Sequence, residues 1–106
     1  MFGLVIRCEL KAGSHGRFDE LVAEVVKMAR KEPQGLIAYS CHPVSGLADS
    51  RIFIELYADH VAFVEFGRRP DIRRFVDARD ALLAEPPRVD FIESPVGGSL
   101  LYFGRT

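Results

Sequence analysis

Alternating apolar and polar positions at the start of the chain predict a β-strand with two unlike faces. Between Phe2 and Leu10 the even positions are all apolar, whereas Arg7 and Glu9 fall on the other face. A period of two is the pattern of a half-buried strand. We therefore expect the first element to be a strand that ends near Leu10.

A helical period follows the glycine-rich linker 11–16. Apolar residues recur at the spacing of one helix face at Phe18, Leu21, Val22, Val25 and Ala29. This spacing predicts an amphipathic helix. Pro33 and Gly35 come next and indicate where the helix has ended.

Two strands separated by a turn-rich segment are expected next. Residues 36–43 and 51–58 are rich in apolar and β-branched side chains, and residues 44–50 carry turn signals. Strands connected in this way suggest a hairpin.

The second strand of this hairpin has two apolar faces that differ in kind. One face carries aliphatic side chains, Ile52, Ile54 and Leu56, and the other carries Phe53, Glu55 and Tyr57. We expect the aliphatic face to pack on the helices. The aromatic face, which would also carry Arg7 from the first strand, is then expected to be free to pack on a second copy of the chain, because such a patch is large for a small monomer.

Two further helices and a fourth strand complete the pattern. Asp59 is a suitable N-cap for a short helix to about Phe66, which Gly67 can end. Pro70 is tolerated at the first position of another helix, and Asp71 suits its positive end. The apolar stripe of that helix comprises Ile72, Phe75, Val76, Leu82 and Leu83. Residues 88–94 then predict a strand.

The order strand, helix, strand, strand, helix, strand predicts a ferredoxin-like βαββαβ sandwich of the α+β class. A chain of 106 residues has room for one such domain, which we assign to residues 1–94. Residues 95–106 form an apolar tail that contains Leu100, Leu101, Tyr102 and Phe103. We expect this tail to pack, either as an extra strand or as an arm on a partner subunit.

Composition and charge narrow the classes of function. With 14 basic and 15 acidic residues the net charge is only -1, which gives no field to attract nucleic acid or an anionic membrane. No apolar run approaches the length of a membrane span, and we expect a cytoplasmic protein. The two cysteines, Cys8 and Cys41, have neither CxxC spacing nor clustered histidines, so we expect no disulfide and no metal site.

Four segments of the chain carry a family resemblance. These are "MFGLVIRCELKAG", "KEPQGLIAYSCHP", "IFIELYADHVAF" and "RRPDIRRFVDARDALLAEPPRVDFIE". Over residues 2–94 the sequence resembles the antibiotic biosynthesis monooxygenase family of dimeric α+β barrel proteins. The resemblance implies a homodimer formed through a sheet face. It also implies an activity such as cofactor-free oxygenation of quinols or polyketide-type phenols, which some members carry out.

Two departures from the family pattern bear on activity. Phe66 and Asp71 stand where many of these sequences have histidines. The chain also contains no Asn and no Trp, which the haem-degrading members use, so the resemblance excludes that branch.

Oxygenation without a cofactor requires a dry cavity, a base for an aromatic hydroxyl and hydrogen-bond donors near the developing charge. We assign candidate catalytic roles to His42, Tyr39 and Asp71. His42 is the first choice as base, because histidine titrates near neutral pH. The alternative interpretation is a partly exposed histidine at the end of a strand, without a catalytic role. His15 and His60 are expected on the surface.

A second set of residues is expected to form the walls of the cavity. The substrate-binding candidates are Phe63, Phe66, Ile72, Phe75 and Arg73. The first four either line a hydrophobic cavity or fill it. Arg73 either steers an acidic ligand or belongs, with Arg68, Arg69 and Arg74, to a solvated helix face.

The sequence therefore favours a homodimeric, cofactor-independent monooxygenase that acts on a small aromatic quinol or phenol without metal or flavin. Two alternatives stay open. One is a non-catalytic ligand-binding or interaction module with the same fold. The other is an isomerase of a small anionic metabolite that uses His42 and an arginine.

Overall fold

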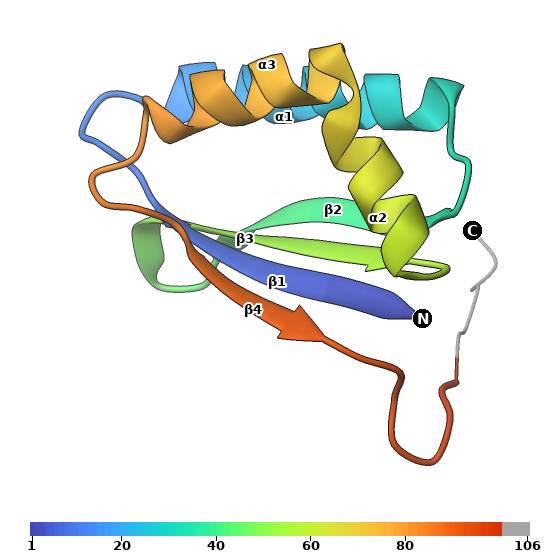
Figure 1. The fold of residues 1–106 in the computed structure, drawn as a ribbon. Coiled ribbons are helices and arrows are strands. Elements are labelled where there is room, and N and C mark those ends of the chain that lie inside the picture. Colours follow the sequence, from blue (N-terminus) through green and yellow to red (C-terminus); the bar gives the residue numbers. More distant parts are fainter. Residues whose placement is uncertain (101–106) are drawn as a thin grey trace, which may run out of the picture.

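The computed structural model describes residues 1–100, and within them the strands and helices follow the order that the sequence predicts (Figure 1). In chain order the elements are β1 (Phe2–Glu9), α1 (His15–Lys31), β2 (Leu36–Val44), β3 (Leu47–Tyr57), α2 (His60–Arg68), α3 (Pro70–Asp80) and β4 (Arg88–Ile92). The βαββαβ order is confirmed, with its second helical segment divided into α2 and α3.

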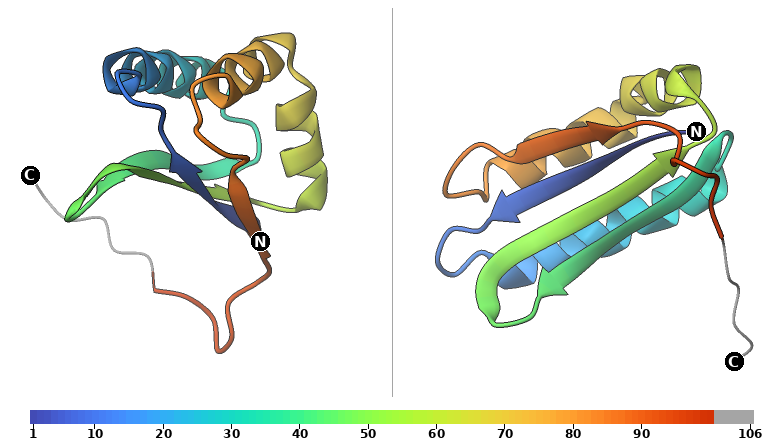
Figure 2. Two further views of the ribbon diagram at one scale, coloured as in Figure 1. Left: turned by 90° about the vertical axis from the view of Figure 1, so that its left-hand side faces the viewer. Right: turned by 90° about the horizontal axis from the view of Figure 1, so that it is seen from below.

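The four strands form one antiparallel sheet in the order β2-β3-β1-β4. Helices α1 and α3 lie side by side over one face of the sheet, and α2 connects the helix layer to the end of β3 (Figure 2). We call the face beneath the helices the inner face and the opposite one the outer face. This two-layer arrangement confirms the predicted ferredoxin-like α+β sandwich.

The ends of α2 and α3 follow from local chemistry. The Asp59 carboxylate accepts a hydrogen bond from the backbone N–H of Ala62 at 2.8 Å, which confirms the predicted N-cap. Gly67 does not end α2, which continues to Arg68. The break comes at Arg69, whose backbone is extended (φ -60°, ψ 130°), because Pro70 disfavours a helical conformation in the residue before it.

The inner and outer faces of β3 are the reverse of those expected. Phe53 and Tyr57 are completely buried and Glu55 is 5% exposed, all three beneath the helices. Ile54 is 38% exposed on the outer face. The prediction was wrong because both faces of β3 are apolar, so alternation alone does not say which one the helices cover. Large aromatic rings fill the deeper space between the two layers.

Arg7 also lies on the face opposite to Glu55, contrary to expectation. It stands across from Ile52 in the β1–β3 register, and residues directly opposite one another share a face. On the outer face Arg7 donates to Glu9 at 2.9 Å, and Glu9 accepts from Ser50 at 2.6 Å. These hydrogen bonds lower the pKa of the Glu9 carboxyl, the one from Ser50 most.

The prediction that the tail packs concerns residues that lie mostly outside the described part of the chain. Leu101, Tyr102 and Phe103 fall outside it, and Leu100, the last described residue, is 92% exposed. The fourth strand ends at Ile92. Within residues 1–100, none of the helices is long and apolar enough to cross a membrane.

Candidate functional site

Aromatic rings fill the layer between the helices and the inner face of the sheet. Phe53, at the centre of β3, has its ring centroid 6.0 Å from that of Phe18 on α1, and 6.1 Å from those of Tyr39 on β2 and Phe75 on α3. Further along the sheet, Tyr57 lies 5.7 Å from Phe66 on α2. Side chains from two strands and three helices therefore pack into one apolar core.

A carboxyl group lies inside this aromatic layer. Glu55 projects from β3 between Phe53 and Tyr57, and the Tyr57 hydroxyl donates a hydrogen bond to its Oε1 atom at 2.7 Å. Burial raises the pKa of Glu55, and the hydrogen bond from Tyr57 and the positive charge of Arg79 oppose this shift only in part. The site thus holds an acid whose proton is retained to higher pH than usual.

The two tyrosines of the layer stay protonated. Burial raises the pKa of the Tyr39 phenol, and the negative charge of Glu55 raises it further. The same two causes raise the pKa of Tyr57. Both phenols are therefore hydrogen-bond donors at neutral pH.

A buried arginine completes the interior. Arg79 on α3 is 6% exposed, and its Nε donates to Asp80 Oδ1 at 2.9 Å. Its guanidinium carbon lies 5.4 Å from the ring centroid of Phe53 and 5.8 Å from that of Phe75, within the range of a cation–π contact. We call the following residues the interior cluster: Tyr39, Phe53, Glu55, Tyr57, Phe66, Phe75 and Arg79.

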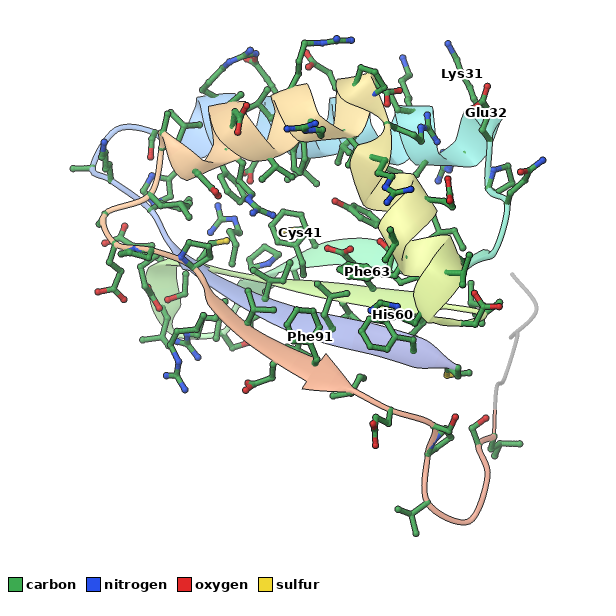
Figure 3. All side chains as sticks on the ribbon, viewed as in Figure 1. Lys31, Glu32, Cys41, His60, Phe63 and Phe91 are labelled. Carbon is green, nitrogen blue, oxygen red and sulfur yellow. The ribbon has the colours of Figure 1, made fainter. Side chains whose placement is uncertain are left out.

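Three predicted site residues, Tyr39, Phe66 and Phe75, belong to the interior cluster, and two more, Phe63 and Ile72, pack in the same hydrophobic core. Tyr39 and Phe66, from β2 and α2, have ring centroids 5.6 Å apart. Phe63 lies beside Tyr57 at 5.4 Å, and Figure 3 shows it between α2 and the sheet. Ile72 and Phe75 are buried beneath α3. Their roles toward a substrate stay predictions, but all five residues belong to one hydrophobic core.

The other predicted residues lie away from that core. His42 is exposed on the outer face, where it stands across from Ile52, and its Nε2 atom is 2.8 Å from Ser40 Oγ. Asp71 forms an ion pair with Arg69 at 2.9 Å, and this partner lowers the pKa of Asp71. Arg73 is exposed on α3. None of the three belongs to the interior cluster.

The remaining histidines and cysteines have other surroundings. His15 Nε2 lies 2.9 Å from Asp49 Oδ1, and His60 packs at the open end of the aromatic layer with its ring 4.9 Å from that of Phe2 (Figure 3). Burial raises the pKa of the Cys8 thiol to about 11 and that of Cys41 to about 12, so both are poor nucleophiles at neutral pH. In the described residues, no three His, Cys, Asp or Glu side chains cluster as metal ligands would.

Sequence reasoning missed Glu55 and Arg79 as members of the site. The signal for Arg79 was its position four residues after Phe75 and seven after Ile72, which places it on the apolar stripe of α3. Glu55 was considered as a residue of a dimer face, because the faces of β3 were assigned the wrong way round.

Comparisons with known proteins place the chain by its fold. No family model matches the sequence, and no curated protein matches it either. Solved structures that resemble the fold include the following three, each at low sequence identity. An antibiotic biosynthesis monooxygenase has a TM-score of 0.81 and 20% identity, over 90% of this chain and 99% of that one.

A variant of SnoaB, a cofactor-independent oxygenase from Streptomyces nogalater, has a TM-score of 0.75 and 17% identity, over 88% of this chain and 91% of that one. A conserved protein from Methanosarcina mazei Go1 has a TM-score of 0.81 and 14% identity, over 86% and 89%. At such identities the likeness concerns the fold. The chain has the ferredoxin-like α+β fold of the antibiotic biosynthesis monooxygenases.

Proposed function

We propose that the protein is a cofactor-independent monooxygenase acting on a small aromatic quinol or phenol. The observation that carries this proposal is the Glu55 carboxyl, which is enclosed by aromatic rings and hydrogen-bonded by the Tyr57 hydroxyl at 2.7 Å. A base in a dry aromatic space is what this reaction requires of a protein, because the electrons that reduce oxygen come from the substrate. The fold shared with SnoaB, named a cofactor-independent oxygenase, supports the proposal.

Glu55 would act as the base that removes the proton of the substrate hydroxyl. Burial raises the pKa of Glu55, which brings it closer to that of a phenol, near 10. A smaller gap between the two pKa values makes the proton transfer easier. The tyrosine hydroxyls of the interior cluster can donate to oxygen atoms that gain negative charge in the transition state.

The oxidation itself then takes place on the substrate. The deprotonated ring passes electrons to O₂, and a C–O bond forms at a ring carbon that carries hydrogen. The O–O bond breaks, one oxygen stays on the ring as a carbonyl, and the other leaves as water with the two hydrogens that the substrate loses. For 1,4-dihydroxynaphthalene the sum is quinol plus O₂ giving hydroxynaphthoquinone plus water.

The aromatic side chains would hold the ring and exclude water. Phe53, Phe66 and Phe75 are each at least 93% buried, and their faces and edges suit a planar ligand. A hollow of about 210 Å³ between α1 and β2 reaches Tyr39.

The proposal is tested with purified protein and 1,4-dihydroxynaphthalene under oxygen. We expect oxygen uptake and quinone formation above the rate given by boiled protein. Glu55→Gln should lower the rate about 100-fold or more, and the same change at the exposed Glu65 serves as the matched control and should leave it unchanged. A wild-type rate equal to that of boiled protein would refute the proposal.

The prediction for His42 is tested in the same assay. If His42→Ala lowers the rate more than His15→Ala does, His42 belongs to the site. Equal rates for the two variants would remove His42 from it.

The proposal includes a homodimer formed through the outer face of the sheet. That face carries an apolar band of Val5, Ile52, Ile54, Leu56 and Ile92. Stacking two such faces would remove the band from water. Light scattering should give twice the chain mass of 11.9 kDa, and Ile54→Glu should halve it. A wild-type mass of one chain at micromolar concentration would contradict the dimer.

A further inference from the structure

Arg79 has two amino groups without a protein partner. Among residues 1–100, only its Nε donates a hydrogen bond, to Asp80, and Nη1 and Nη2 have none. A guanidinium has five N–H donors in a rigid fork, and since every fully buried side-chain nitrogen or oxygen among the described residues has a partner, Nη1 and Nη2 must reach solvent. The side chain is nevertheless 93% buried.

Two more polar atoms of the interior cluster also lack partners in the described part of the chain. The Tyr39 hydroxyl makes no hydrogen bond, and Glu55 uses Oε1 but not Oε2. Every fully buried side-chain nitrogen or oxygen among the described residues has a partner. The free atoms of Arg79, Tyr39 and Glu55 must therefore each touch space wide enough for a water molecule.

Two of these groups lie against the same aromatic ring, and the third comes from the same strand as that ring. The Arg79 guanidinium lies over the Phe53 ring at 5.4 Å, and the Tyr39 ring lies 6.1 Å from the same ring. Glu55 follows two residues later on the same face of β3. The charge of Arg79 acts on the pKa of both Tyr39 and Glu55, which agrees with their closeness.

The free atoms define the chemistry of a ligand. The two amino groups of Arg79 suit an ionised oxygen, best a carboxylate held through two parallel hydrogen bonds. The Glu55 carboxylate has a free oxygen that can accept a hydroxyl proton. The rings of Phe53 and Phe75 leave a flat, apolar environment around both groups. A neutral hydrocarbon would leave the arginine unpaired.

We propose that the interior cluster binds a small hydroxylated aromatic anion, with its ionised oxygen on Arg79 and its hydroxyl on Glu55. This inference rests on the proposed function, because it names the class of phenol that would be the substrate. It makes the substrate an acidic phenol, such as a hydroxyaromatic carboxylate. If Arg79 had only a structural role, stacked on Phe53 and Phe75, the ligand would not need a negative charge.

The test is an equilibrium measurement without oxygen. The fluorescent probe 3-hydroxy-2-naphthoate is titrated with wild-type protein, and 3-hydroxy-2-naphthamide, which lacks the negative charge, is titrated in parallel. We expect the acid to bind roughly 10- to 100-fold more tightly than the amide, as charge-assisted hydrogen bonds to an arginine predict. Equal binding of acid and amide by wild-type protein would overturn the proposal.

Three variants assign the preference to Arg79. Arg79→Met should lose it, whereas Arg74→Met, on the same helix but exposed, should keep it. If Arg79→Met does not fold, Arg79→Lys takes its place, because it keeps the positive charge. It should reduce the preference for the acid, because an ammonium cannot make the paired hydrogen bonds. A full preference in either Arg79 variant would also overturn the proposal.

The two proposals can fail separately. If the protein prefers the acid but gives no product with oxygen, the anion site is supported and the oxygenase proposal is refuted. If the protein oxidises 1,4-dihydroxynaphthalene but binds the acid and the amide equally, the oxygenase proposal is supported and the anion site is refuted.

Discussion

Removing the Tyr57 hydroxyl should destabilise the protein, and more so at high pH than at low pH. In the wild-type chain this hydroxyl is the donor to Glu55 Oε1 at 2.7 Å, with Tyr57 completely buried and Glu55 5% exposed. Tyr57→Phe leaves that oxygen without its donor and changes the packing little. The expected loss is about 1.5–3 kcal/mol where Glu55 is ionised and about 0.5–1.5 kcal/mol where it is neutral.

The pH dependence has a definite sign. Burial raises the pKa of Glu55 above its ordinary value of 4.5, so the folded state binds this proton more tightly than the unfolded chain does. The stability contributed by the protonated form is complete below that ordinary value and is lost as pH rises through the raised pKa. Tyr57→Phe should raise the pKa of Glu55 further and so increase the stability that is lost as pH rises. Glu55→Gln should remove this pH dependence of stability.

Urea unfolding followed by circular dichroism measures these differences, since the chain has no tryptophan to report by fluorescence. Stability is compared near pH 5 and near pH 8 for wild type, Tyr57→Phe and Glu55→Gln. For a domain of this size each kcal/mol corresponds to roughly 4–8 °C in Tm. An equal loss for Tyr57→Phe at both pH values would refute the assignment of Glu55 as a buried acid held by Tyr57.

Further changes test the packing around the interior cluster, all by the same unfolding measurement. Phe53→Ala, which removes the central ring, should cost about 3–5 kcal/mol; a loss below about 1 kcal/mol would mean that the layer is not packed as described. Gly35→Ala should cost more than Gly46→Ala, because both backbones have positive φ (71° and 77°) but a Cβ at Gly35 would lie only 2.5 Å from that of Ala62. Equal losses would contradict the close approach of α2 to the start of β2. Asp59→Ala should cost about 0.5–2 kcal/mol through loss of the α2 cap, and Asp59→Asn, which can still accept the bond, should restore most of it.

Much of the fold could be predicted from the sequence, because local signals agree along the chain. The alternation that ends near Leu10, the helical spacing from Phe18 to Ala29, the N-cap at Asp59 and the proline at the first position of α3 all act over a few residues. Each of them is present in the structure. The ferredoxin-like order follows once these elements are assigned.

The orientation of β3 could not be predicted in the same way. Phe53 and Ile54 are both apolar, and which of them faces the helices depends on the volume that the two layers leave between them. That volume is a property of the packed structure and has no local signal in the sequence. The error placed Tyr57 and Glu55 on the wrong face, so Glu55 was assigned to a dimer face. His42, chosen as base because histidine titrates near neutral pH, lies on the outer face.

The candidate site was predicted in part for the same reason. Phe66, Phe75 and Ile72 lie on helix faces that apolar periodicity identifies, so the walls of the interior were named. Arg79 lies on the same stripe, but a charged residue there is usually counted as solvated. Its burial depends on stacking over Phe53 and Phe75, which is a tertiary contact.

The central claim is that Glu55 directs the insertion of oxygen into an aromatic ring held beneath the helices. It is tested most directly by running the reaction of 1,4-dihydroxynaphthalene under ¹⁸O₂ and measuring the mass of the product. The account predicts hydroxynaphthoquinone with one heavy oxygen atom from wild-type protein, formed about 100-fold or more slowly by Glu55→Gln. Unlabelled product, or labelled product formed equally fast by both proteins, would contradict it.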